Sequence, residues 1–289
     1  MSVSSGLGMP RTLAVGDATI AYRECGSGRP IVFVHGLLVN GDLWRDVVPL
    51  LAPRFHCIVP DWPLGSHALP LLAEADLRPL AVAKLVADFI AARDLRDVVL
   101  VGSNTGGAIC QLVISEHPQR IGALVLANCD AYENFFPPAF RALTYLARIP
   151  GFIDLLASGL RSERLQRLIC ATVAHRKPAA EILRSYFEPL IMQPGVRRDA
   201  RKFIAAVDRR YTLEAARSFA RFDRPVGIIW GEDDRVFFPI GFARRLCAAF
   251  PQSRLRIVPG SRTFVSEDRP HDFADFITEI TNTPVSSVA

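Results

Sequence analysis

One segment of this chain has the layout of a catalytic turn without the reagent that such a turn usually carries. Residues 98–107 read VVLVGSNTGG, so a β-branched run reaches a glycine and a helix-forming pattern follows the last glycine pair. A strand, a tight turn and a helix in this order are typical of a turn that exposes a nucleophile at its centre. The central residue is Asn104, whose neutral amide cannot act as an alkoxide, thiolate or carboxylate does.

Asn104 also has a structural reason to occupy this turn. The central residue of such a turn takes a positive φ, which asparagine tolerates better than most residues. The asparagine therefore preserves the turn while it removes the chemistry, and an engineered Asp→Asn replacement is an alternative that the sequence leaves open. Its neighbour Ser103 is expected to point away from any pocket and is not expected to replace the nucleophile.

Apolar strand patterns alternate with helical patterns on both sides of this turn. Continuous apolar strands between helices predict an α/β fold with a mostly parallel central sheet that helices flank on both faces. The strand patterns outside the turn lie at 31–36, 56–60, 121–129, 225–231 and 254–260.

A long segment without strand patterns interrupts this alternation after the sixth strand. The sequence therefore predicts an α/β core formed by 1–130 and 225–289, with an all-helical cap at 131–224. Because ligands bind beyond the carboxyl ends of the strands in such sheets, the cap would roof the site. The cap segment holds 17 Lys and Arg against 9 Asp and Glu, a net charge of +8 in a chain of +5. A basic cap would attract an anionic substrate, although a solvated helical face explains the same count.

The composition narrows the class of protein. No apolar run approaches the roughly 20 residues that span a bilayer, and we expect neither a signal peptide nor membrane binding. The six cysteines form no CxxC pair, so we expect reduced thiols and a cytoplasmic protein without a metal site. The basic residues do not run together, which argues against nucleic-acid binding. The oligomeric state is left open, with a homodimer as one alternative.

Four motifs in order resemble the α/β-hydrolase superfamily, in its haloalkane dehalogenase and epoxide hydrolase branch with a helical cap. The resemblance covers about residues 11–280 and implies an α/β-hydrolase fold. It is carried by His35-Gly36 after the third strand, VGSNTGG at the turn, WGEDD at 230–234 and PGSRTFVSEDRP at 259–270.

The resemblance implies a role for each matched position. Leu37 and Thr105 would supply the two backbone N–H groups of an oxyanion hole. Asn104 takes the place of the nucleophilic aspartate, Asp234 that of the triad acid, and Thr263 that of the catalytic histidine. The catalytic triad is therefore degenerate at two of its three positions. Haloalkane dehalogenases hold the halide with polar donors such as a tryptophan, and Thr105 and Leu37 support that function poorly.

Further residues are expected at the substrate pocket. His35 and Gly36 lie in the loop before the oxyanion hole, and His67 follows a core strand on the side where the pocket opens. His67 is a candidate base or substrate-binding group, with a loop hydrogen bond as the alternative. Asp130 is a second candidate acid, and a carboxylate without a histidine partner could act as a base if burial raised its pKa. The cap tyrosines are expected to be ordinary packing residues.

Three functions fit these residues. Two N–H donors and Asn104 at one point suit cyclisation, isomerisation, elimination or retro-aldol-type cleavage of a small carbonyl compound, with no metal and no organic cofactor. The second hypothesis is a hydrolase of esters, epoxides or carbon–halogen bonds that is silenced at Asn104 or uses an unrecognised base. The third is a protein that binds a ligand in the same pocket without turnover. The fold alone does not choose among them.

Overall fold

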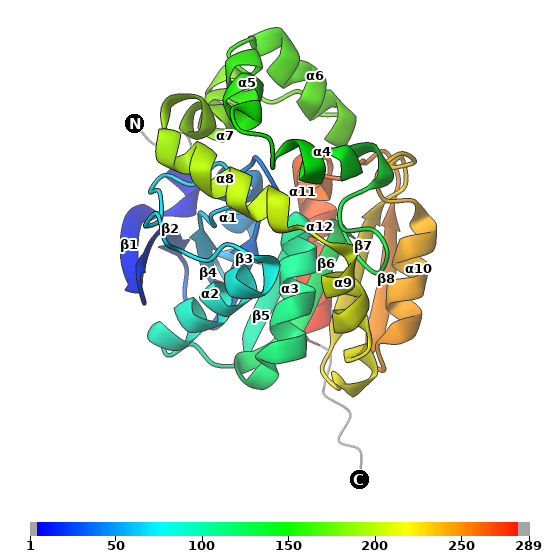
Figure 1. The fold of residues 1–289 in the computed structure, drawn as a ribbon. Helices are drawn as coiled ribbons and strands as arrows, with labels where there is room; N and C mark the ends of the chain where they lie inside the picture. The colour runs from blue at the N-terminus through cyan, green and yellow to red at the C-terminus, as the bar shows by residue number, and fades with distance from the viewer. Residues whose placement is uncertain (1–4, 283–289) are drawn as a thin grey trace.

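The computed structural model describes residues 5–282. They form an eight-stranded sheet with helices on both faces and a further helical layer over the ends of the central strands (Figure 1). The strand order is β1-β2-β4-β3-β5-β6-β7-β8. Strand β2 pairs antiparallel with β1 and β4, and the other pairs are parallel, which confirms the mostly parallel sheet. The strands are β1 Met9–Val15, β2 Ala18–Cys25, β3 Arg29–Val34, β4 Phe55–Pro60, β5 Val98–Asn104, β6 Ile121–Cys129, β7 Val226–Gly231 and β8 Ser253–Val258.

Two helical layers cover the sheet. Helices α2, α3, α9 and α10 lie on the near face in Figure 1, whereas α1 and α12 pack together on the far face. These helices and the neighbouring short helix are α1 Val48–Leu51, α2 Pro79–Ala92, α3 Thr105–Glu116, α9 Arg209–Ala216, α10 Ile240–Ala249, α11 Val265–Asp268 and α12 Pro270–Thr281. Helix α9 falls within the segment 131–224 that the sequence assigns to the cap, yet it packs against α3 in the core layer. A helical pattern alone does not specify which layer a helix joins.

The helical layer above the sheet follows β6, at the position that the sequence predicts for the insertion. Its helices pack mainly on one another, with α8 in contact with α4, α5 and α7. They are α4 Arg141–Leu146, α5 Phe152–Gly159, α6 Glu163–Val173, α7 Ala180–Met192 and α8 Pro194–Ala206. In Figure 1 they lie over the ends of the central strands, and we refer to α4–α8 as the cap.

Buried polar contacts hold the cap on the core. The Tyr186 hydroxyl on α7 donates to Glu267 Oε1 at 2.8 Å, and Arg45 donates to the same carboxylate with both of its terminal nitrogens. The Asn40 side-chain amide donates to Ser185 Oγ at 2.9 Å. The Arg45–Glu267 pair lies within the core, and the cap joins it through the Tyr186 hydroxyl. Because a hydrogen bond to a charged group contributes about 1.5–3 kcal/mol, this contact helps to hold the cap over the strand ends.

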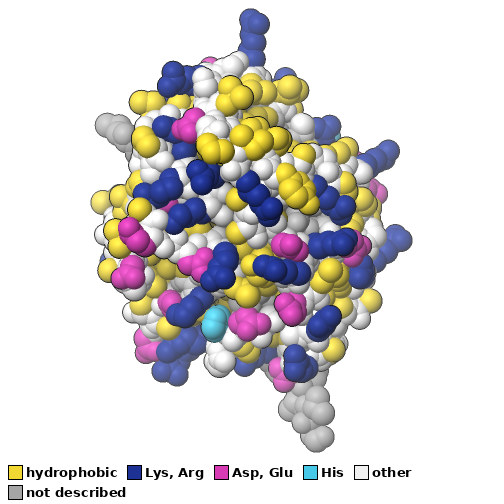
Figure 2. Space-filling model, in the orientation of Figure 1, with side chains coloured by type: hydrophobic (Ala, Val, Ile, Leu, Met, Phe, Trp, Pro, Cys, Tyr) yellow, Lys and Arg dark blue, Asp and Glu magenta, His cyan; other side chains and the backbone are white. Residues whose placement is uncertain are grey.

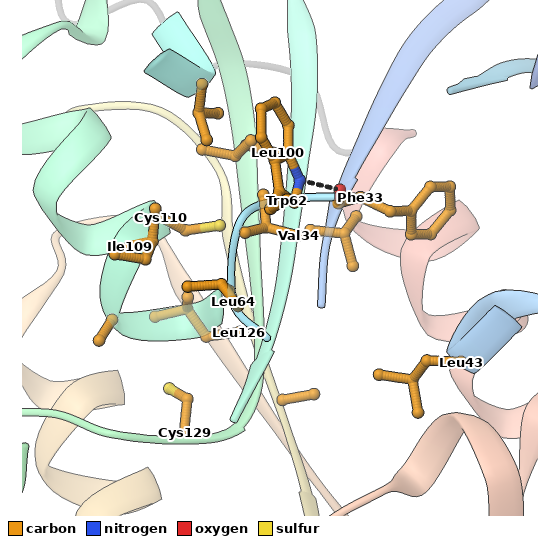
Figure 3. Close-up of a cluster of buried hydrophobic side chains, with 14 of the residues drawn as sticks. Phe33, Val34, Leu43, Trp62, Leu64, Leu100, Ile109, Cys110, Leu126 and Cys129 are labelled. Atoms are coloured by element: carbon orange, nitrogen blue, oxygen red, sulfur yellow. Dashed lines mark hydrogen bonds between the residues drawn. The ribbon is translucent and has the colours of Figure 1, made fainter. Parts of the chain in front are cut away.

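The central strands are apolar because both of their faces are covered. Phe33, Val34 and Leu100 lie in the buried cluster of Figure 3, where Ile109 of α3 packs on the sheet. The Trp62 indole N–H donates to the carbonyl oxygen of Phe33 at 2.9 Å, so this large ring is satisfied within the core. The packed layer gives rigid support to the residues at the ends of β3, β5 and β6. No helix within residues 5–282 has the length and hydropathy needed to cross a membrane.

Candidate active site

The turn at Asn104 has the backbone geometry that the sequence predicts. Asn104 ends β5 at φ 55° and ψ −130°, and α3 begins at the next residue. Glycines let the strands and the helix approach closely at this point. A Cβ at Gly36 would lie 2.7 Å from the Asn104 Cβ, and one at Gly106 would collide with the carbonyl oxygens of Val34 and His35. Residues with such rarely populated backbone angles are often found at functional sites. Here this backbone conformation places the Asn104 side chain above the strand ends.

A cavity of about 140 Å³ lies between the strand ends and the cap. Its wall is largely apolar, and the segment that follows β6, from Phe136 to Phe187, contributes more than half of the aromatic and aliphatic side chains. Four polar residues line it, namely Asn104, Thr105, Asp130 and Thr172, and Leu37 lines it beside them. No lysine, arginine or histidine is among its lining residues in the described part of the chain. The basic side chains of the cap segment therefore do not line this cavity.

Asp130 is the carboxylic acid in this cavity. It follows β6, its side chain is 1% exposed, and Oδ1 has no hydrogen-bond partner among residues 5–282. Burial raises the pKa of Asp130 well above the usual range of an aspartate, and the hydrogen bond from Thr105 opposes this only in part. A buried carboxyl group whose pKa is raised inside a cavity is a candidate general acid or base.

A short hydrogen-bonded chain joins Asp130 to Asn104. Thr105 Oγ1 lies 3.3 Å from Asp130 Oδ2 and 3.1 Å from Asn104 Oδ1. A hydroxyl has one hydrogen to donate, so it serves one of these acceptors at a time. When Asp130 is protonated, its O–H can donate to Thr105 Oγ1 while Thr105 donates to Asn104 Oδ1. The Asn104 amide nitrogen then keeps its hydrogens for a ligand.

Asp234 and Thr263 form the pair that the sequence predicts, but they do not line the cavity. Thr263 Oγ1 donates to Asp234 Oδ2 at 2.6 Å, and the Asn128 amide donates to the same oxygen at 3.0 Å. Asp234 Oδ1 accepts the N–H groups of Phe237 and Phe238 at 3.1 and 3.2 Å. The single hydrogen of the Thr263 hydroxyl is engaged by Asp234, and Thr263 does not reach the cavity wall. The prediction that Asp234 and Thr263 are catalytic residues gains no support from the cavity, because neither residue lines it.

Replacing Thr263 by valine is expected to lower the free energy of unfolding by about 1–3 kcal/mol, because Asp234 loses a buried donor. Thr263→Ser keeps the hydroxyl and should remain close to the unmodified protein. Urea denaturation of the two variants measures the difference. Ligand binding in the cavity should be unaffected by Thr263→Val, and a large loss of binding would instead give Thr263 a direct role.

His35 and Gly36 support the site from behind instead of lining the cavity. The Trp62 N–H donates to His35 Nε2 at 2.8 Å, so the ring hydrogen lies on Nδ1, which is 2.9 Å from the Gly36 carbonyl oxygen. Burial lowers the pKa of His35 to about 4, and the ring is neutral at physiological pH. His35 therefore fixes the loop that presents Leu37.

His67 is buried away from the cavity and connects the core to the cap. Its Nε2 lies 3.2 Å from Asp199 Oδ2 on α8, and Asp199 also accepts the Leu71 N–H at 2.8 Å. The prediction that His67 lines the pocket is wrong, and its alternative as a loop hydrogen-bonder describes the structure. Sequence periodicity could not show this contact, because its two residues are 132 positions apart.

Several cap residues that sequence reasoning did not select form the cavity wall. Phe136, Pro137 and Phe140 come from the segment just after Asp130, and Phe187 comes from α7. The FFPPAF run at 135–140 was the available signal, because it places three aromatic side chains close to a strand end. Tyr132, Tyr145, Tyr186 and Tyr211 are not among the residues that line this cavity in the described chain. Tyr132, Tyr186 and Tyr211 are buried, as the expected packing role requires, whereas Tyr145 is exposed.

The chain belongs to the α/β-hydrolase fold family, whose sequence model, described as alpha/beta hydrolase fold, matches residues 29–270. It is 28% identical over 270 residues to Haloalkane dehalogenase 2 of Mycobacterium tuberculosis, covering 90% of each chain. It is 26% identical over 267 residues to Non-heme chloroperoxidase CPO-A1 of Kitasatospora aureofaciens, covering 88% of this chain and 91% of that one. The crystal structure of the ancestral haloalkane dehalogenase AncHLD2 superposes with a TM-score of 0.77 at 25% identity, covering 94% of this chain and all of the other.

The family model places the chain in the α/β-hydrolase fold family, and the relatives to which it is similar include haloalkane dehalogenases. The α/β-hydrolase fold that the four sequence motifs predict is confirmed, and the similarity to haloalkane dehalogenases agrees with the predicted branch. The chemistry of the site follows from its own residues, because one fold supports many reactions.

Proposed function

We propose that this chain is an α/β-hydrolase-fold enzyme that moves a proton on a small carbonyl compound without a covalent intermediate, as an isomerase or a lyase. The observation that carries this proposal is the buried Asp130 carboxyl in an apolar cavity, linked through Thr105 to Asn104. A carboxylate in such surroundings is a stronger base than one in water, because its charged form is poorly solvated.

The other half of the site would bind the carbonyl oxygen. Thr105 is the first residue of α3, so its backbone N–H has no partner within the helix, and Leu37 lines the cavity beside it. The Asn104 amide nitrogen is a further donor when Oδ1 accepts from Thr105. Donors fixed around one point stabilise an enolate oxygen more than a neutral carbonyl oxygen, and this difference lowers the barrier.

The proposed step is balanced in atoms and charge. Asp130 takes a hydrogen as a proton from the carbon next to the carbonyl, and the C–H electron pair moves to form the enolate. Return of the proton to another carbon of a conjugated enolate completes an isomerisation. Loss of a leaving group from the adjacent carbon completes an elimination. Neither route needs a nucleophile at the turn, which accounts for Asn104.

The cavity limits the size and the charge of the substrate that it can bind. A volume of about 140 Å³ is close to that of a cavity of about 150 Å³ that holds one benzene ring. Its lining offers no positive side chain for an anion, so the proposed substrate is neutral and about the size of one six-membered ring. The anionic substrate that the basic cap suggests is therefore not assigned to this cavity.

Hydrogen exchange tests the proposal. Cyclohexanone, 2-cyclohexenone and phenylacetone are incubated with the protein in D2O, and loss of the α-hydrogen signals is followed by NMR. The proposal expects faster exchange than in buffer alone, with one ketone clearly preferred. Binding of the ketones without exchange would support the non-catalytic protein, and turnover of esters, epoxides or haloalkanes would support a hydrolase.

A second candidate function is a hydrolase in which Asn104 replaces the nucleophile, because Asn104 keeps the positive φ of the turn and a relative is named a dehalogenase. Under our proposal, Asn104→Asp yields no covalent adduct with 1,2-dibromoethane, since the halide donors are missing, and it slows ketone exchange. Intact-protein mass after incubation measures the adduct. An alkylated Asn104→Asp protein beside an unmodified parent would favour the silenced hydrolase.

A further inference from the structure

A second concave surface, of about 440 Å³, lies on the outside of the cap between α4 and the junction of α8 and α9. Arg141, Arg148 and Arg209 line it together with Tyr145, and we call it the arginine groove. Figure 2 shows Lys and Arg side chains spread over the face on which α8 and α9 lie. The groove is larger than the central cavity and, unlike it, strongly polar in its lining residues.

The three guanidinium groups keep donors for a ligand. None of them forms an ion pair with a carboxylate of residues 5–282. Arg141 donates one hydrogen bond to the Glu133 carbonyl oxygen at 3.3 Å, and Arg148 donates to the Ala205 carbonyl oxygen at 3.3 Å. Because each guanidinium carries five N–H donors, most of them remain available.

The two carboxylates in the groove are already engaged. Glu133 accepts two hydrogen bonds from Arg245, at 3.0 and 2.8 Å. Asp208 caps the N-terminus of α9 and accepts the Arg210 N–H at 2.8 Å. Glu133 is paired mainly with Arg245, which does not line the groove, and it also attracts Arg141. Asp208 keeps its charge, so the three arginines exceed the two carboxylates of the lining by one positive charge.

An aromatic surface lies beside these charges. The Tyr145 side chain is 68% exposed, and the Arg148 guanidinium lies 5.5 Å from the centre of its ring. A tyrosine left this open, next to guanidinium groups, can stack against a flat ring of a ligand. Guanidinium forks match phosphate oxygens, and the three terminal oxygens of a phosphate monoester offer three guanidinium groups more acceptor sites than the two oxygens of a carboxylate do.

We propose that the arginine groove binds a small aromatic phosphate, with the phosphate between Arg141, Arg148 and Arg209 and the ring against Tyr145. This site is separate from the central cavity and does not rest on the proposed reaction. The segment 133–141 separates the two, since Glu133, Phe135 and Arg141 line the groove, whereas Phe136, Pro137 and Phe140 line the cavity.

Calorimetric titration with phenyl phosphate and with inorganic phosphate tests the proposal on the full chain. Arg209→Gln and Arg141→Gln should each weaken phenyl phosphate binding about tenfold, as expected for one lost charge-assisted contact. The matched control is Arg184→Gln, an exposed arginine on α7 that lines neither the groove nor the cavity, and its affinity should be unchanged. Tyr145→Leu should remove the preference for phenyl phosphate over inorganic phosphate.

Three results would overturn the proposal. The first is equal binding of phenyl phosphate to the unmodified protein and to the Arg141→Gln/Arg209→Gln variant. The second is a loss in Arg184→Gln as large as in Arg209→Gln, which would show general attraction to a basic surface. The third is equal affinity for both phosphates with no effect of Tyr145→Leu, which would remove the aromatic ring from the proposed ligand.

Discussion

Replacing Asp130 by asparagine should slow α-hydrogen exchange of the preferred ketone about 10²–10⁴-fold, the usual contribution of a positioned general base. Asparagine has nearly the same shape and still accepts the hydrogen bond from Thr105, but its amide cannot take a proton. NMR in D2O measures the rates. Asp154→Asn, which changes an exposed carboxylate paired with Arg197, is the matched control and should exchange at the unmodified rate. Equal rates in Asp130→Asn and the parent would contradict the assignment of Asp130 as the base.

The direction in which the exchange rate changes with pH shows whether Asp130 acts as a general base or as a general acid. The proposed base acts in its ionised form, and burial raises the pKa of Asp130 well above its usual range. The exchange rate should therefore rise with pH through a range in which an ordinary aspartate is already ionised, and then level off. A rate that falls with pH over this range would mean that the protonated form acts, as a general acid.

The Asp130→Asn variant should be more stable than the parent at neutral pH. The folded state holds the Asp130 proton to a higher pH than the unfolded chain, whose aspartates ionise near pH 4. Between these two pKa values the unfolded chain binds fewer protons, so this group lowers stability by up to about 1.4 kcal/mol per pH unit as pH rises. The asparagine side chain of the variant does not titrate, and the Tm of the variant should rise further above that of the parent as the pH increases above the ordinary aspartate pKa of about 4. A constant difference would mean that Asp130 ionises normally in the fold.

Local patterns were sufficient to predict the framework of the site. The β-branched run before Gly102 and the helical pattern after Gly106 predict the strand and the helix that enclose Asn104, and its positive φ follows from the turn between them. Asp130 could be selected because it directly follows an apolar strand of a parallel sheet, where side chains reach the ligand edge. These inferences need only short-range periodicity and one topological rule.

The positions of several predicted site residues could not be read from the sequence, because they depend on side-chain length and on contacts between distant segments. The position of Thr263 in the chain matches a catalytic histidine, but its short side chain ends at Asp234 and never reaches the cavity. His67 follows a core strand as predicted, yet Asp199 of the cap holds it in the interior. Neither result follows from periodicity, because each is decided by which groups face one another after the cap has packed on the core.

Gly106→Ala should cost about 3 kcal/mol of unfolding free energy, at the upper end of typical overpacking penalties. The added methyl group would collide with the carbonyl oxygens of Val34 and His35, which lie at the end of β3. Strand β3 is paired with β4 and β5 on its two sides, so it cannot move away without breaking the sheet. Urea denaturation measures the loss, as a shift of the midpoint.

Gly241→Ala is the matched control for this prediction, because nothing lies within 4 Å of the added methyl group on α10. In a helix this change usually stabilises by about 0.5–1 kcal/mol, so the two alanine variants should shift the unfolding midpoint in opposite directions. The close approach at Gly106 is also what holds the Thr105 N–H against the loop of Leu37. If Gly106→Ala were tolerated as well as Gly241→Ala, the turn would be too loose to fix two donors on one oxygen, and the proposed enolate stabilisation would lose its structural basis.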